Sequence, residues 1–220
     1  MAALLVPALI FCAPGIGNKQ NPQKVPYMND DAPSVDTDEL NYVYPNAYDR
    51  IQDVDFENLN VRIYYSATHL AVSEQLKKGK YNHQDNHGFE TITFDDVYYL
   101  NSDSKNRQLA LVLITWFYGG GSSNTDGIAQ VFELINHRLK LVQQIHWDEH
   151  FDTNLAYFFF NTNLQRLIVR TAHYLPGDSH CCISAMDTVT FRWNGSRFVQ
   201  AGLRTGLSRF GVRNGKKLVN

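Results

Sequence analysis

The run Leu109-Ala-Leu-Val-Leu-Ile-Thr-Trp-Phe-Tyr118 decides the fold of this chain. Ten residues without polar alternation predict a strand that is buried on both of its faces. A glycine triplet at residues 119–121 ends the strand. Two further strand-like runs, residues 128–135 and 139–147, are joined by Asn136-His137-Arg138. The stretch therefore predicts consecutive strands of one β-sheet.

Residues 139–147 alternate between apolar and polar side chains. A period of two is typical of a half-buried antiparallel strand. The predicted apolar face holds Leu139, Leu141, Ile145 and Trp147, and the predicted polar face holds Lys140, Gln144 and His146.

The rest of the chain repeats this pattern of strands and turns. Strand-like runs recur about every ten residues, and few segments have helical periodicity. Within residues 89–100 the acidic pair Asp95-Asp96 interrupts the alternation, which predicts a β-bulge. The sequence therefore predicts an all-β fold, an antiparallel sandwich or open barrel built of hairpins, with at most one short helix near residues 71–77.

The last hairpin has the strongest turn signal. Asn194-Gly195 lies between two alternating runs, and Asn-Gly favours a two-residue type I′ turn. That turn places Arg192 opposite Arg197 on the outer face, where the two side chains either point freely into water or are neutralised by the acidic segment around residues 53–57 or by an anionic ligand. We therefore predict Arg192 and Arg197 as binding residues. The predicted register pairs are Trp193–Ser196, Arg192–Arg197, Phe191–Phe198 and Val189–Gln200.

Composition divides the chain into four segments. We expect a signal segment at residues 1–17, an acidic linker and edge segment at 18–59, the β domain at 60–203 and a basic tail at 204–220. The first segment contains no charged residue, and its apolar part is too short to span a bilayer. The alternative is a buried N-terminal strand or helix. We expect a periplasmic, envelope-associated or secreted protein without a transmembrane span.

Charge is distributed unevenly. Residues 18–60 hold nine acids and three bases, whereas residues 192–220 hold seven bases and no acid. The basic block is either solvated or lies on the acidic segment, or it contacts an anionic surface or nucleic acid. We expect no nucleic acid, because a formal net charge of −2 does not imply a polyanion partner.

The densest group of possible metal ligands follows the strand at 139–147. It comprises His146, Asp148, Glu149 and His150. The His-x-x-x-His spacing serves zinc on a helix, but on a strand these two histidines would stand roughly 13 Å apart. A solvated loop is therefore the first interpretation and a metal or acid–base site the second, and we expect no cofactor.

Two cysteines, Cys181 and Cys182, remain if the signal segment is removed. Adjacent cysteines form only a strained disulfide, and structural zinc sites usually separate them by a spacer. We predict that both are structural, either as buried thiols or as a vicinal disulfide, and the alternative is a catalytic thiol paired with a histidine.

Several segments together resemble a group of exported bacterial proteins, loosely of the LppP/LprE lipoprotein type. The resemblance covers residues 60–200 and implies an exported β-rich domain with no established catalytic residues. The chain departs from the group at Ser102-Asp103-Ser104-Lys105, where an Asp-Gly-Asp-Gly-like loop is usual, and at Phe11, where a lipobox has a small residue. The segments are Asp95-Asp96-Val97-Tyr98-Tyr99, Gly119-Gly120-Gly121-Ser122, Val131-Phe132-Glu133-Leu134, Ser179-His180-Cys181-Cys182 and Phe191-Arg192-Trp193-Asn194-Gly195-Ser196-Arg197-Phe198.

Two functions follow as hypotheses. The first is an exported, non-enzymatic envelope or secreted domain that binds a protein or an envelope component. The second is a metal-dependent hydrolase that uses the loop at 146–150, together with His173 and His180. Convergence of those side chains in a concave pocket would favour the hydrolase.

Overall fold

The computed structural model divides the chain into two compact units, residues 1–32 and 33–220. The structure describes residues 35–66, 69–86, 88–102, 107–119, 123–147, 153–173 and 185–207. The predicted signal segment, Cys181, Cys182 and most of the basic tail lie outside these residues. The unit described below is the second.

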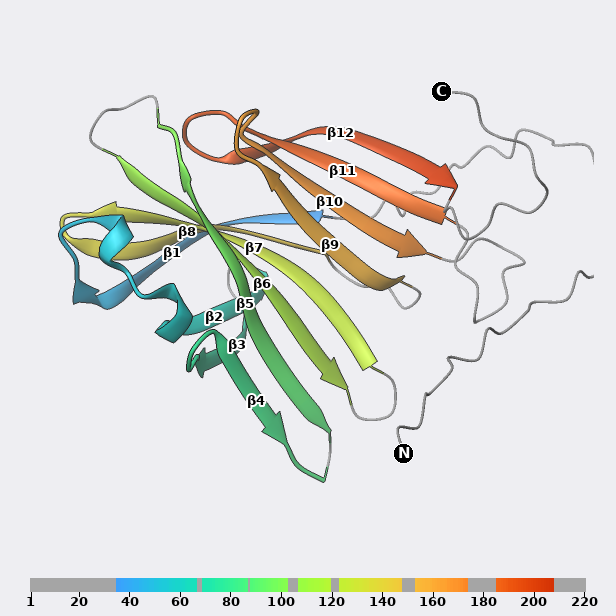
Figure 1. The fold of residues 1–220 in the computed structure, drawn as a ribbon, viewed down its shortest axis with the longest axis horizontal. Coiled ribbons are helices and arrows are strands. Elements are labelled where there is room, and N and C mark those ends of the chain that lie inside the picture. Colours follow the sequence, from blue (N-terminus) through green and yellow to red (C-terminus); the bar gives the residue numbers. More distant parts are fainter. Residues whose placement is uncertain are drawn as a thin grey trace, which may run out of the picture. The chain divides into compact units, whose positions relative to one another are not determined.

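The described residues form three antiparallel sheets, so the predicted all-β fold is confirmed (Figure 1). The largest, sheet A, has the strand order β1-β8-β7-β6-β5-β4 and is curled. Its strands are β1 (Val35–Ala47), β4 (Lys80–Gln84), β5 (Phe89–Leu100), β6 (Gln108–Gly119), β7 (Ser123–Ile135) and β8 (Arg138–Trp147).

The two smaller sheets are each built from consecutive strands. Sheet B pairs β2 (Asn60–Ser66) with β3 (His69–Gln75). Sheet C has the order β12-β11-β10-β9, with β9 (Thr153–Asn161), β10 (Arg166–His173), β11 (Ala185–Trp193) and β12 (Phe198–Leu207).

Helical structure in the described residues is limited to two 3₁₀ turns, η1 (Ile51–Asp53) and η2 (Phe56–Asn58). The short helix allowed near residues 71–77 is absent there, because β3 occupies residues 69–75 and pairs with β2. The turn that follows has positive φ at Lys78 (52°) and Gly79 (76°), which reverses the chain into β4.

Strand β6 is buried on both faces, as its uninterrupted apolar run predicts. Ala110, Val112 and Ile114 pack into a first core with the η turns and β2. Leu109, Leu111 and Leu113 pack into a second core with β10, β11 and β12. Sheet A is therefore the middle layer between the two cores.

The half-buried alternation predicted for β8 is wrong. In the pairing with β7, Phe132 faces Leu141 and Val131 faces Gln143, so Val142 is an extra residue. The bulge reverses the side chains after it, because one inserted residue shifts a period of two. Leu139 and Leu141 therefore lie in the first core, whereas Ile145 lies in the second.

The bulge predicted at the acidic pair of β5 is confirmed. Phe94 pairs with Ile114 and Asp96 pairs with Leu113, which leaves Asp95 as the extra residue. The Asp95 carboxylate accepts a hydrogen bond from the Thr115 hydroxyl at 2.7 Å. Burial raises the pKa of Asp95, and this hydrogen bond opposes the rise.

The predicted register of the last hairpin is also wrong. Trp193 pairs with Phe198 and Arg192 with Val199, so the connection has four residues, 194–197, rather than two. The Asn194 side-chain oxygen explains the longer turn, because it accepts hydrogen bonds from the backbone N–H groups of Ser196 (3.0 Å) and Arg197 (2.9 Å).

Two strands extend into segments that the composition sets apart. Strand β1 begins at Val35, inside the segment assigned as acidic linker and edge, and pairs with β8 at the edge of sheet A. Strand β12 extends to Leu207, which lies within residues 204–220. An edge strand presents unpaired backbone groups, so β8 can pair with an extended segment on the side away from β7.

Candidate functional site

Two arginines lie directly opposite each other on the outer face of sheet C. Arg166 of β10 pairs with Arg192 of β11, and both side chains are exposed. Directly opposite residues of an antiparallel pair have Cβ atoms about 4.5–5.5 Å apart. Their neighbours Leu167 and Phe191 are fully buried in the second core, which directs the arginines outward. The like charges repel unless an anion lies between or above them.

A second row of basic residues crosses the same face. Thr188 of β11 pairs with Arg170 on one side and with Arg204 on the other. Arg166 and Arg170 are four residues apart on one strand, hence about 13 Å apart. We call Arg166, Arg170, Arg192 and Arg204 the arginine face.

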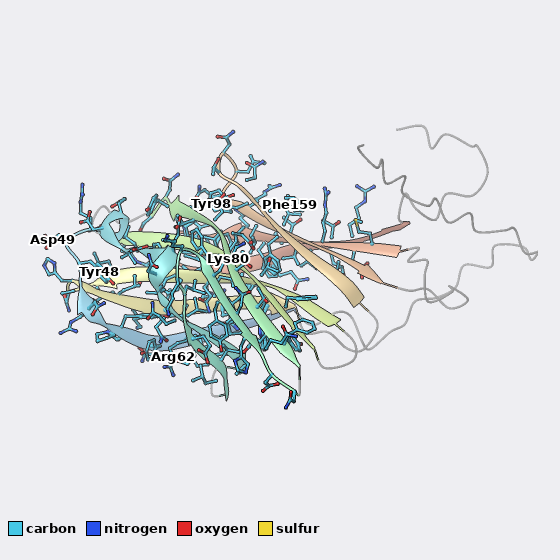
Figure 2. All side chains as sticks on the ribbon, turned by 60° about the horizontal axis from the view of Figure 1, so that its bottom comes forward. Tyr48, Asp49, Arg62, Lys80, Tyr98 and Phe159 are labelled. Atoms are coloured by element: carbon cyan, nitrogen blue, oxygen red, sulfur yellow. The ribbon has the colours of Figure 1, made fainter. Side chains whose placement is uncertain are left out.

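The row between the two basic rows carries small or apolar residues. Ile168 pairs with the 49% exposed Phe159 of β9, and Thr190 pairs with Gly202 of β12 (Figure 2 labels Phe159). The Arg170 guanidinium lies 5.5 Å from the Phe159 ring centre. A Cβ atom at Gly202 would meet nothing within 4 Å, so this part of the face is open.

No acid of the described part of β9–β12 lies on the arginine face. Asp187 is the acidic residue of these strands, and it is buried at 5% exposure on the opposite, inward side. The acidic segment at residues 53–57 does not neutralise the arginine face either. This corrects the hypothesis that the acidic segment is the partner of Arg192. Ile51 and Phe56 anchor that segment in the first core, on the other side of sheet A.

Two acids of that segment, Asp53 and Asp55, have local partners instead. The Arg50 guanidinium donates to the Asp53 carboxylate at 2.6 Å. This hydrogen bond lowers the pKa of Asp53. The Asn58 amide donates to Asp55 at 2.8 Å.

Arg197, the second predicted binding residue, is not beside Arg192. It lies in the 194–197 turn and lines a shallow groove of about 430 Å³. The predicted arginine pair is therefore wrong, because Val199 takes the predicted place of Arg197 on the β12 side of Arg192, whereas Arg166 lies on its β10 side. The groove is lined by Leu40, Arg107, Lys140, Val142, Gln143, Asn194, Ser196 and Arg197.

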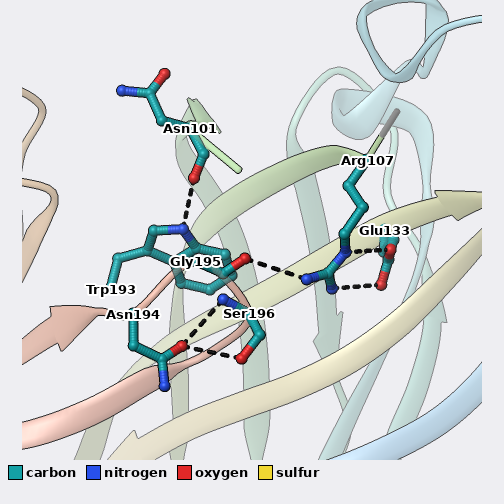
Figure 3. A network of polar contacts seen from close by, with 7 residues as sticks. All are labelled: Asn101, Arg107, Glu133, Trp193, Asn194, Gly195 and Ser196. Carbon is teal, nitrogen blue, oxygen red and sulfur yellow. Dashed lines mark hydrogen bonds and ion pairs between the residues drawn. The ribbon is translucent and has the colours of Figure 1, made fainter. Parts of the chain in front are cut away.

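Arg107 lines this groove and is the centre of a network of polar contacts, which Figure 3 shows. Its guanidinium donates to both carboxylate oxygens of Glu133, at 2.7 and 2.8 Å, and to the Gly195 carbonyl at 3.1 Å. The hydrogen bonds with Glu133 raise the pKa of Arg107. Nearby, the Trp193 indole N–H donates to the Asn101 carbonyl at 2.6 Å. These contacts join the 194–197 turn to β6 and β7, which makes the groove a part of the interface between sheets A and C.

The proposed metal-ligand group is represented in the described residues by His146. This side chain is 6% exposed and follows Gln144 on the first-core side of β8. Asp148, Glu149 and His150 lie outside the described residues, as does His180. Within the described ranges, no three His, Cys, Asp or Glu side chains are grouped to hold a metal ion.

The sequence interpretation missed Arg166 and Arg170. A usable signal was present in Arg166-Leu-Ile-Val-Arg170. Side chains alternate between the two faces of a strand, so both arginines lie on one face, and Leu167 and Val169 lie on the other. Arg204 lacked such a signal, because the register of β12 depends on a bulge between its pairs with Thr190 and Phe191.

Within the part of the chain that the structure describes, no helix is long and apolar enough to cross a membrane. The similarity to exported proteins of the LppP/LprE type stays a prediction. Comparison with protein-family models, curated proteins and solved structures found no match to this chain.

Proposed function

We propose that this chain is an exported, non-enzymatic β domain of the cell envelope or the secreted fraction, and that it binds an anionic partner through the arginine face. The Arg166–Arg192 pair is the observation that carries the proposal. Two like charges held opposite each other destabilise a sheet, so their presence is explained by an anion that binds both. Arginine suits this role because its planar guanidinium binds carboxylate or phosphate through two parallel hydrogen bonds.

Two further features support the proposal. The arginine face is exposed, and the acid within its strands is turned inward. The uncharged N-terminal segment supports export.

Binding to a soluble polyanion tests the arginine face. Full-length protein should bind polyglutamate, and Arg166→Gln with Arg192→Gln should weaken that binding. Gly202→Glu should weaken it as well, because the open position accepts a side chain and adds a negative charge without removing an arginine. Lys77→Gln with Lys80→Gln is the matched control, since it removes two positive charges from the exposed β3–β4 turn. Equal loss in the control and in the arginine variant would contradict the proposal.

N-terminal sequencing of the exported protein tests the localisation. We expect a mature chain that begins after roughly the first 17 residues. Recovery of the intact Met1 from a cytosolic fraction would rule export out.

A further inference from the structure

Two large apolar side chains are exposed beside the arginine face. Phe159, at 49% exposure, lies in the row between the two basic rows. Leu164, at 57% exposure, lies in the turn between β9 and β10, two residues before Arg166. Its backbone N–H donates to the Asn161 side chain at 3.0 Å, which holds the turn next to the Asn161–Arg166 pair. Phe159 is thus combined with the arginines on one face of sheet C, and Leu164 is exposed in the turn that leads to Arg166.

We infer that the partner of the arginine face is an anionic lipid surface, an inference that rests on the proposed function. Arginines bind the phosphate groups of anionic headgroups, and neighbouring apolar side chains enter the boundary between headgroups and acyl chains. A soluble polyanion would neutralise the four arginines but would leave Phe159 and Leu164 in water. A bilayer surface accounts for both kinds of side chain.

Neither of two hollows formed by described side chains is lined by the arginine face, which favours a flat partner surface over a small ligand. The arginines stand on a sheet face with small or half-buried residues between them, including Thr190 and Gly202. The two hollows lie elsewhere. One is the groove beside Arg107, and the other is lined by residues of β3, β4 and their turn, and none of the four arginines lines either of them.

Sedimentation with lipid vesicles provides the test. Full-length protein is mixed with vesicles of phosphatidylcholine alone or of phosphatidylcholine with phosphatidylglycerol, at low and at high salt. We expect binding to the phosphatidylglycerol vesicles that weakens with salt, because the headgroup attraction is screened. Arg166→Gln with Arg192→Gln should lower the affinity roughly 25-fold, since each arginine near an anionic surface contributes about a factor of five. Lys77→Gln with Lys80→Gln should leave it unchanged.

Apolar substitutions separate a lipid surface from a soluble polyanion. Phe159→Ser with Leu164→Ser should lower vesicle affinity about tenfold, through the loss of apolar burial, and should leave polyglutamate binding unchanged. Both positions are exposed, so folding should survive, and a thermal melt checks this. A decrease in vesicle binding that persists at high salt would identify the apolar contribution.

Each remaining outcome overturns a defined part of the argument. Wild-type binding to polyglutamate but not to vesicles would overturn the lipid inference and leave the proposed function intact. If neither probe shows binding that depends on the arginines, both the lipid inference and the proposed function are overturned. Vesicle binding that is lost only when the tail residues Arg209, Arg213, Lys216 and Lys217 are changed to Gln would assign the membrane contact to the tail and overturn the inference.

Discussion

Gln143 and Gln144 are consecutive residues of β8 whose side-chain amides hold backbones on opposite faces of sheet A. The Gln143 amide donates to the Phe198 carbonyl and accepts from the Phe198 N–H, both at 2.9 Å. The Gln144 amide donates to the Tyr64 carbonyl at 2.6 Å and accepts from the Tyr64 N–H at 3.3 Å. A primary amide offers the same donor and acceptor as a peptide group, so each glutamine acts as one rung of a β-ladder. The layers are therefore joined by polar as well as apolar contacts.

Gln143→Ala should destabilise the fold by roughly 2–4 kcal/mol, because it leaves the N–H and the carbonyl of Phe198 buried without their partner. Urea denaturation measures the change. Gln84→Ala, at an exposed position of β4, is the control and should alter stability by less than about 0.5 kcal/mol. A Gln143→Ala protein as stable as this control would show that water replaces the amide.

Arg192→Thr should stabilise the protein by a few tenths to about 1 kcal/mol in the absence of a partner, because it removes the repulsion with Arg166. Arg166→Thr should act in the same way, and the double variant should gain less than the sum of the two. Arg204→Thr is the control, since Arg204 lies opposite Thr188. Denaturation measures the free energy of unfolding of each variant. If the changes of the two single variants add up to that of the double variant, the two guanidinium groups already point away from each other and do not repel.

Arg107→Gln should destabilise the fold by about 1–3 kcal/mol, because Glu133, whose side chain is 13% exposed, loses a bidentate partner. The 194–197 turn should also loosen, since Arg107 binds the Gly195 carbonyl, and hydrogen exchange at Ser196 and Arg197 would report this. Arg50→Gln removes an exposed ion pair with Asp53 and should leave the melting temperature unchanged. Faster exchange in the Arg50 variant would contradict this assignment.

Tyr98→Phe should change the dependence of stability on alkaline pH. A hydrogen bond with Asp96, followed by burial, raises the pKa of Tyr98 to about 12 in the folded protein. An unfolded tyrosine ionises near pH 10, so the stability that Tyr98 contributes is complete below about pH 10 and is lost as the pH rises towards 12. The free-energy difference between wild type and Tyr98→Phe should therefore shrink by about 1–2 kcal/mol across that interval, after allowance for partial exposure. A constant difference would show that the hydrogen bond does not form.

The comparison of arginine and apolar variants on vesicles and on polyglutamate separates a lipid surface from a soluble polyanion as the partner of the arginine face. The predictions for Gln143, Arg107 and Tyr98 are independent of it, because they concern contacts away from the outer face of sheet C.

The sequence by itself determined the all-β class and the character of the central strand. The unbroken apolar run of β6 requires burial on both faces, and the acidic pair at residues 95–96 marks a bulge in β5. Local composition is sufficient for such features, because hydrophobic periodicity and turn chemistry depend on neighbouring residues.

The tertiary structure alone decided which side chains share a face. Two bulges reverse the alternation that the sequence suggests. One is the extra residue Val142 in β8, and the other lies in β12 between the partners of Thr190 and Phe191. Such bulges are set by packing between layers and by a turn that Asn194 closes through its side chain, neither of which appears in a period of two. The four-residue turn thus pairs Arg192 with Val199 instead of Arg197, and the separate pairing of β10 with β11 places Arg166 on its other side.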